Sequence, residues 1–289
     1  MIDVSHNTLQ RLFPALFVVL WSTGFIGAKL GLPYAEPATF LILRFGFVLV
    51  LLLPICWLSG ARWPAPRDAL QMGIAGVFLQ AGYLGGVFAS LHQGMPAGVS
   101  ALITGLQPVF TAALGAAVLG ERTGPRQWLG LALGLLGVVL VVADRIAMDR
   151  VGLEPILLSF LALSSITLGT VWQKRHGAAV DLRTGAALQF MAAALVMAPF
   201  TLLETGAVRW TGEFVFALAW LVLVLSLGAI FLLLFLIRQG AASRVASLFY
   251  LVPPTTALIA WPLFGETYTF AAAAGMGLGM LAVWLVIRQ

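Results

Sequence analysis

The sequence predicts an all-α membrane protein: ten transmembrane helices arranged as two inverted five-helix repeats. Its 289 residues are 61% hydrophobic and only 9% charged, a composition outside the range of soluble domains. Apolar runs of about twenty residues, long enough to cross a hydrocarbon core as a helix, recur along the whole chain. The two halves of the chain also match each other at a nearly constant offset.

Ten apolar segments are predicted to span the membrane, and short connections join them. In chain order they are residues 13–32, 38–58, 69–90, 95–118, 126–143, 153–173, 184–203, 214–237, 243–264 and 270–287. Of the 16 lysines and arginines, 11 fall on the side of the N-terminus and 4 on the opposite side. Basic residues are enriched in cytoplasmic connections, so both termini are predicted to be cytoplasmic.

An internal repeat divides the chain into residues 1–146 and 147–289. The stretch QPVFTAALGAAVLGERTGPRQWLGLALGLLGVVLVV (107–142) matches VPPTTALIAWPLFGETYTFAAAAGMGLGMLAVWLVI (252–287) at an offset of 145 residues. Pro108 then aligns with Pro253, and Glu121 with Glu266. Each repeat holds five spans, an odd number, so the second repeat enters the membrane from the opposite side. Inverted repeats of this kind are typical of carriers that work by alternating access.

These features resemble the EamA-type branch of the drug/metabolite transporter superfamily. The resemblance rests on VLWSTGFIGAKLGL in the first segment, EPATFLILRF in the second, and a proline thirteen residues before the glutamate of a Gly-Glu pair in both halves. It covers essentially the whole chain. It implies a ten-helix exporter or exchanger of small metabolites, such as amino acids, in a bacterial inner (cytoplasmic) membrane.

The same resemblance bears on the charge of the substrate. Small multidrug-resistance proteins, four-helix relatives in this superfamily, carry a glutamate in the first helix that couples protons to cationic drugs. The corresponding stretch here, LFVVLWSTGFIGAK, has no acidic residue. Neutral, zwitterionic or anionic substrates are therefore expected.

Two prolines mark the middle of the fourth and ninth segments. Proline in a helix interior deletes a backbone hydrogen bond and crowds the preceding turn, which lipid tolerates where the freed groups face a cavity or a neighbouring helix. Pro108 and Pro253 are thus candidate hinges beside a central substrate site. A kink that only shapes helix packing is the alternative.

Polar and aromatic side chains near these prolines are candidates for lining the cavity, because polar groups at mid-membrane face the bundle interior. The main candidates are Trp21, Gln80, Tyr83, Gln107 and Tyr250. Weaker candidates are Ser22, Thr104, Trp172, Gln173, Gln189, Thr255 and Thr256. Hydrogen bonds between helices, or aromatic packing, are the alternative roles for these residues.

Arg44 is a basic residue well inside a predicted span. Three roles are open: attracting a substrate carboxylate, pairing with Glu36, or extending to the headgroups. We interpret Arg44 as mainly structural, with substrate contact as the alternative. Lys29, at the end of the first segment, is predicted to be an interfacial anchor.

Two further sets of residues repeat between the halves. Glu121 and Glu266 precede predicted helices, where a negative charge suits a helix N-terminus; gating or anchoring of the two loops is the alternative. Glycines spaced Gly-x-x-x-Gly allow close approach of backbones, and they predict that the fifth and tenth segments pack together, within one chain or across a dimer. These glycines are Gly130, Gly134, Gly275 and Gly279.

No catalytic residue, metal site or cofactor is expected, because the three histidines are distant in the predicted topology and Cys56 is the single cysteine. Expected partners are a small-molecule substrate and the lipid bilayer, without nucleic acid, for a monomer or homodimer. A membrane-embedded enzyme acting on a lipid or isoprenoid is an alternative function, but no catalytic motif is visible. A non-transporting receptor or scaffold is another, and it would not require two similar halves.

Overall fold

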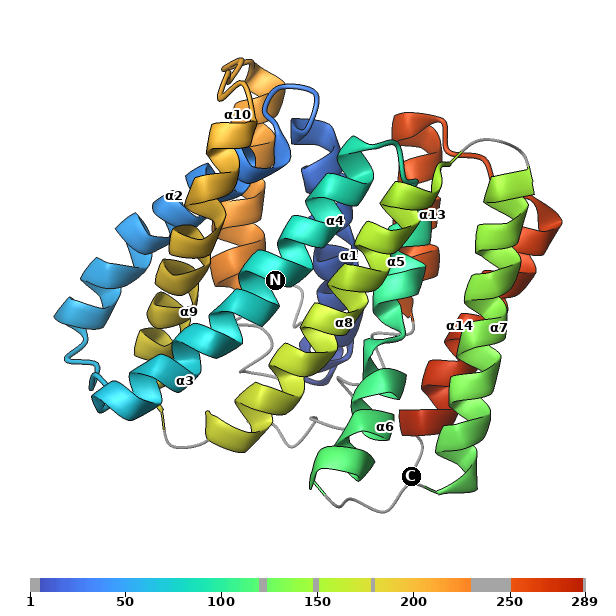
Figure 1. The fold of residues 1–289 in the computed structure, drawn as a ribbon, viewed down its shortest axis with the longest axis horizontal. Coiled ribbons are helices and arrows are strands. Elements are labelled where there is room, and N and C mark those ends of the chain that lie inside the picture. Colours follow the sequence, from blue (N-terminus) through green and yellow to red (C-terminus); the bar gives the residue numbers. More distant parts are fainter. Residues whose placement is uncertain (1–5, 120–123, 148–150, 178–179, 230–250, 288–289) are drawn as a thin grey trace.

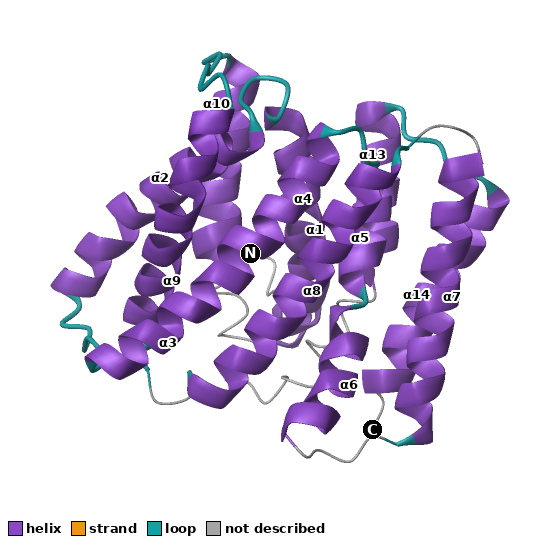
Figure 2. Ribbon diagram, in the orientation of Figure 1, coloured by secondary structure: helices purple, strands orange, loops and turns teal. Residues whose placement is uncertain are grey.

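The computed structural model describes residues 6–119, 124–147, 151–177, 180–229 and 251–287. Within these ranges every regular element is a helix (Figure 2), so the predicted all-α class is confirmed there. Two of the predicted site residues, Glu121 and Tyr250, lie outside the described residues, as do parts of the eighth and ninth predicted spans.

The described residues of the first half form eight helical elements, and those of the second half form seven. The first eight are α1 (His6–Gly31), α2 (Pro37–Leu58), α3 (Pro66–Gly76), η1 (Val77–Gly82), α4 (Tyr83–His92), α5 (Ala97–Gly105), α6 (Gln107–Leu119) and α7 (Pro125–Ala147). The other seven are α8 (Leu153–His176), α9 (Leu182–Met197), η2 (Ala198–Leu203), α10 (Gly212–Ala219), η3 (Trp220–Ala229), α13 (Val252–Phe264) and α14 (Phe270–Ile287).

Several of these elements join into longer apolar rods. Elements α3, η1 and α4 form one span over Pro66–His92, and η1 is a π-helical segment in its middle. Five described helices are long and apolar enough to cross a membrane, and five shorter apolar helices accompany them. Ten crossings remain a prediction.

The helices run between two ends of the bundle (Figure 1). We call the end that carries connections 32–36, 93–96, 204–211 and 265–269 the upper end. The end that carries connections 59–65 and 177–181 is the lower end. In the predicted topology the upper end faces outward and the lower end faces the cytoplasm.

The fourth predicted span is interrupted next to Pro108, one of the two candidate hinges. Helix α5 ends at Gly105 and α6 starts at Gln107, so Pro108 lies in the first turn of a new helix. A proline is harmless there because the first N–H groups of a helix have no partner within it. Pro253 and Pro254 occupy the same position in α13. A Cβ on Gly105 would lie 3.1 Å from Pro253 Cγ, so the break in one repeat packs on the proline of the other.

Helices α7 and α14 lie side by side at one edge of the bundle (Figure 1). The closest approach is at Gly137 and Gly275, because a Cβ on Gly137 would meet the Gly275 carbonyl oxygen at 2.5 Å. Gly279 also borders this contact, since its N atom would lie 3.1 Å from the same Cβ, whereas Cβ atoms on Gly134 and Gly279 would come closest to Leu106 and Leu102. The pairing of the two helices matches the prediction, but the tightest contact uses Gly137, a glycine that the Gly-x-x-x-Gly pattern did not select.

Contacts between the halves also repeat at the offset of 145. Thr39, in α2, donates its hydroxyl to Glu204, in the connection after η2. Its equivalent Thr184, in α9, donates to the Arg62 carbonyl, in the connection after α2. The acceptors of these two hydrogen bonds differ, but whole helices repeat their neighbours: α1 packs on α13 as its equivalent α8 packs on α6, and α1 packs on η3 as α8 packs on η1.

Candidate functional site

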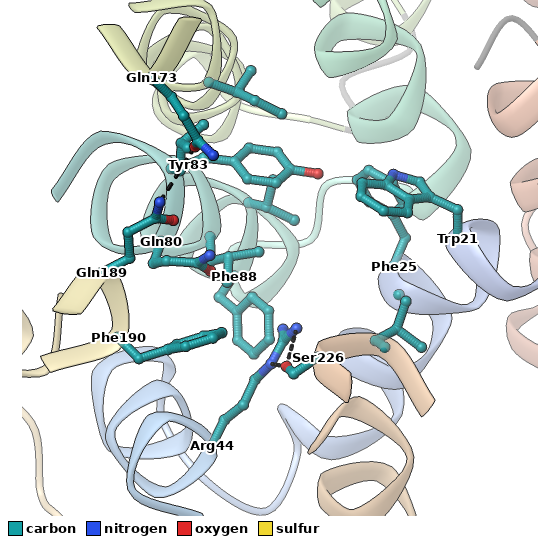
Figure 3. A pocket seen from close by; sticks show the side chains of 16 residues that line it. Trp21, Phe25, Arg44, Gln80, Tyr83, Phe88, Gln173, Gln189, Phe190 and Ser226 are labelled. Carbon is teal, nitrogen blue, oxygen red and sulfur yellow. Dashed lines mark hydrogen bonds between the residues drawn. The ribbon is translucent and has the colours of Figure 1, made fainter. Parts of the chain in front are cut away.

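A cavity of about 300 Å³ lies in the middle of the bundle, and both halves of the chain line it (Figure 3). The first half contributes Trp21 of α1, Arg44 of α2, Gln80 of η1 and Tyr83 of α4. All four were predicted candidates. The second half contributes polar side chains from α8, α9 and η3, namely Gln173, Gln189 and Ser226.

Other predicted candidates lie beside the cavity or away from it. Gln107, Pro108 and Thr104 line a smaller adjoining space of about 30 Å³ that shares Trp21 and Tyr83 with the cavity. The Gln107 amide donates to Thr111 and to Thr170 of α8, each at 3.1 Å. It therefore joins helices at the edge of the site rather than facing its centre.

Four weaker candidates contribute little to the cavity. Ser22 donates to the Val18 carbonyl in its own helix and to the Val252 carbonyl, at 2.8 and 3.3 Å. Trp172 stacks on the His176 ring, with centroids 4.7 Å apart. Thr255 and Thr256 belong to the first two turns of α13 and are absent from the described cavity lining. Of these residues, Ser22 bonds its own helix, as small hydroxyls often do.

Arg44 is buried, with only 7% of the residue exposed, and its guanidinium points into the cavity between Phe88 and Ser226 (Figure 3). Its Nε and Nη2 groups donate to the Ser226 hydroxyl at 3.2 and 3.1 Å. Pairing with Glu36 is not observed, because that carboxylate accepts hydrogen bonds from Thr205 at the upper end. Extension to the headgroups is not observed either.

Three glutamines gather on the opposite wall from Arg44 (Figure 3). The Gln189 amide donates to the Gln173 carbonyl oxygen at 3.3 Å, and Gln80 lies beside them. The internal repeat could have indicated Gln189 as a stronger candidate. At the offset of 145 residues Gln189 is equivalent to Arg44, just as Phe190 is equivalent to Phe45. The sequence interpretation missed Phe25, Phe88 and Phe190, which carry no signal that separates them from core residues. It also missed Ser226, although this residue is polar and lies inside the eighth apolar segment.

A second chamber of about 180 Å³ extends from this wall toward the lower end. It shares Gln80, Gln173, Gln189 and Phe190 with the central cavity. Its far side is formed by Gly177, Val180, Asp181 and Leu182, before and at the start of α9. The central cavity thus adjoins, at its glutamine wall, a chamber that extends toward the lower end.

At the upper end, a cluster around Glu266, which is 8% exposed, joins the two repeats. Its carboxylate accepts from the Ala97 and Gly98 backbone N–H groups, at 2.7 and 3.4 Å, at the start of α5. It also pairs with Lys29 of α1 and accepts from the Tyr268 hydroxyl. We call these five residues the Glu266 cluster.

The cluster differs from the sequence interpretation in two ways. Lys29 forms an ion pair between the repeats, rather than serving simply as an interfacial anchor. Glu266 lies at the N-terminus of α5 instead of the following helix α14. Burial alone raises the pKa of Glu266, but hydrogen bonds from Lys29, Tyr268 and Ala97 outweigh it and lower the pKa below the ordinary value.

A second set of contacts lies at the upper end, between α2 and the connection after η2. Glu204 accepts from the Ala38 and Thr39 N–H groups, at 2.7 and 2.8 Å, and so caps α2. In return, Glu36 accepts from the backbone and the hydroxyl of Thr205, and these hydrogen bonds lower the pKa of Glu36. Both contacts join the first repeat to the second.

Apolar helices in two related halves, around a cavity with polar groups on its walls, form the architecture of a multi-pass membrane transporter. The EamA-like transporter family matches residues 12–143 and 153–288. The chain belongs to this family.

Individual relatives agree with this assignment. The chain is 27% identical over 284 residues to the uncharacterized inner membrane transporter YedA of Escherichia coli K12, covering 96% of this chain and 91% of the relative. It is 28% identical over 280 residues to a "Probable amino-acid metabolite efflux pump" of Salmonella typhimurium, covering 93% and 92%. A solved crystal structure with 20% identity has the same fold, with a TM-score of 0.65 over 95% of this chain and 94% of the other. The protein is therefore a multi-pass transporter of the bacterial inner membrane.

Proposed function

We propose that the protein is a secondary transporter that exports or exchanges small metabolites, such as amino acids, by alternating access. The observation that carries the proposal is the central cavity, which has polar side chains from both repeats and, among the described residues, adjoins a chamber on the side of the lower end. Its volume of about 300 Å³ is at the lower limit of small-molecule sites and suits a substrate of amino-acid size.

The two ends of the bundle support an alternating-access cycle. The Glu266 cluster joins α1 and α5 of the first repeat to the connection after α13 of the second. Opening the upper end requires these contacts to break, and closing the lower end requires the chamber beside Val180 and Asp181 to collapse. In the proposed topology of ten spans with cytoplasmic termini, the described arrangement faces the cytoplasm.

The alternative functions have less support. A lipid-modifying enzyme needs a catalytic group at the site, and the described cavity lining contains amides, aromatic rings, one serine and one arginine. A receptor or scaffold has no need for two halves whose contacts repeat. The relatives' names also describe transporters.

The direct test is transport by purified protein in liposomes. A labelled amino acid or metabolite from a broad panel is expected to exchange in a saturable way. Changing Gln80 to Ala is expected to lower kcat/KM about tenfold, because an amide that meets the substrate is lost.

Gln93→Ala is the matched control. This glutamine bonds Glu154 at the upper end, outside the cavity, so its variant should transport like the unmodified protein. Absence of saturable flux for every amino acid, sugar and nucleoside in the panel would contradict the proposed function.

A further inference from the structure

The charge on the cavity wall is the starting point. Among the described residues that line the cavity, Arg44 carries a positive charge and no aspartate or glutamate is present. The nearest acidic group on the route to the lower end is Asp181, which pairs with Arg183. Residues 230–250, outside the described ranges, contain no Asp or Glu in their sequence, so this segment provides no carboxylate for Arg44.

The hydrogen bonds of Arg44 are incomplete in the described structure. A guanidinium has five N–H donors, and the Ser226 hydroxyl, its one acceptor among the described residues, accepts from two of them. Ser226 uses its own hydrogen for the Leu221 carbonyl, at 3.0 Å, so its lone pairs face Arg44. This arrangement orients the guanidinium without neutralising it.

A buried charge without a counterion is costly, and a role in packing alone does not require one. Within the proposed transport function, we infer that Arg44 is the binding point for a substrate carboxylate. The planar fork of the guanidinium matches a carboxylate with two parallel hydrogen bonds. The substrate then supplies the negative charge that the described cavity lacks.

The opposite wall defines the rest of the ligand. The amides of Gln80, Gln173 and Gln189 offer both donors and acceptors, while the rings of Trp21 and Tyr83 offer faces that attract an ammonium group. A small zwitterion or a monocarboxylate fits this distribution. An amine without a carboxylate adds a second positive charge next to Arg44 and is excluded.

The test compares ligands that share a side chain and differ at the carboxylate. Thermal unfolding of the purified protein in detergent is measured with L-phenylalanine, L-phenylalaninamide and phenethylamine, and with the leucine series of acid, amide and amine. The full set of amino acids and matching 2-hydroxy acids extends the panel. At least one acid is expected to raise the Tm in a saturable way, whereas its amide and amine do not.

Arg44 variants test the residue itself. Arg44→Gln is expected to weaken carboxylate binding about tenfold or more, because a charged hydrogen-bond donor is removed. Arg44→Lys keeps the charge but loses the fork, so intermediate affinity is expected. Without ligand, Arg44→Gln should unfold at the same Tm as the unmodified protein or higher, since it removes a buried charge.

Arg67→Gln, at the exposed start of α3, is the matched control and should bind carboxylates normally. Equal binding of amide or amine, or carboxylate binding by Arg44→Gln within twofold of the unmodified protein, would overturn the inference. If Arg44→Gln does not fold, Arg44→Lys decides, and undiminished affinity there would also overturn it. If sugars, nucleosides or amines bind while no acid does, the inferred carboxylate site is wrong, but the proposed transport function is not contradicted. The proposed function itself fails only when no compound of the panel is transported.

Discussion

At the scale of single residues, Glu266 connects more elements than any sequence pattern suggested. One carboxylate receives the Lys29 ammonium, the Tyr268 hydroxyl and two backbone N–H groups of α5. Helix N-termini favour negative charge, and the ion pair adds attraction in a site that is largely shielded from water. These contacts join the first repeat to the connection after α13, where the upper end must separate if it opens.

Replacing Glu266 with Gln is expected to favour opening of the upper end, because the amide keeps the size but loses the charge that attracts Lys29. The reporter is Leu84→Cys, which lines the central cavity, in a Cys56→Ser background without other cysteines. A membrane-impermeant thiol reagent added at the upper side should label it about tenfold faster in the Glu266→Gln protein, a change corresponding to about 1.4 kcal/mol.

Glu213→Gln is the matched control, since that carboxylate bonds Tyr34 at the same end but lies outside the Glu266 cluster. Equal labelling of both variants would contradict a closing role for Glu266.

The pH dependence of labelling follows from the lowered pKa of Glu266. Ionised Glu266 stabilises the joined upper end fully above the ordinary carboxyl pKa near 4.5. This stabilisation is lost only as the pH falls through the lower pKa of the folded protein. Labelling should therefore stay slow from pH 8 to 5.

At the scale of elements, one closely packed helix pair contrasts with one interrupted span. Helices α7 and α14 meet backbone to backbone at Gly137 and Gly275, without a side chain between them. The fourth span is interrupted at Leu106, and Pro253 of α13 packs beside this break. Interrupted helices beside a central site are typical of inverted-repeat carriers, and α7 with α14 lies away from the described cavity lining.

Gly275→Ala is expected to destabilise the protein by about 1–3 kcal/mol, the usual cost of overpacking. The added Cβ would lie 2.5 Å from the Gly137 carbonyl oxygen and 2.6 Å from Val141 Cγ2. Thermal unfolding in detergent measures the effect. In the same helix, a Cβ on Gly277 meets no described atom within 4 Å, so Gly277→Ala should be neutral or stabilise by about 0.5–1 kcal/mol. A higher Tm for both variants would show that the two backbones are not in contact.

At the scale of the whole molecule, the two repeats enclose the cavity asymmetrically. Clusters of acidic residues and their partners join the repeats at the upper end, whereas a chamber extends from the glutamine wall toward the lower end. The two ends differ even though helix contacts repeat between the two halves of the chain. A carrier of two related halves can adopt the opposite asymmetry by exchanging the conformations of the halves.

The proposed topology predicts which side reaches the chamber. Ala186→Cys, on the chamber wall, in the Cys56→Ser background, should react several-fold faster with an impermeant thiol reagent in inside-out than in right-side-out membrane vesicles. Ala207→Cys, exposed in the connection 204–211 at the upper end, is the control and should react faster in right-side-out vesicles. A preference for right-side-out vesicles would contradict the proposed orientation.

The sequence by itself determined the helical class, the duplication and the depth of Arg44 in the second apolar segment. These follow from hydrophobic length, self-similarity and the high cost of a charge in lipid, which are local properties. Trp21, Gln80 and Tyr83 could likewise be selected because polar and amphipathic side chains inside apolar runs turn toward the interior.

Only the tertiary structure decided which of these side chains meet. Gln107, ranked high, bonds Thr170 at the edge of the site, while Gln173 and Gln189, ranked low, form a wall of the cavity. Gly137 makes the closest helix contact, and Glu266 caps α5 rather than its own next helix. Each outcome depends on how helices far apart in the chain are rotated and packed against each other, and the spacing of residues within one helix carries no record of that.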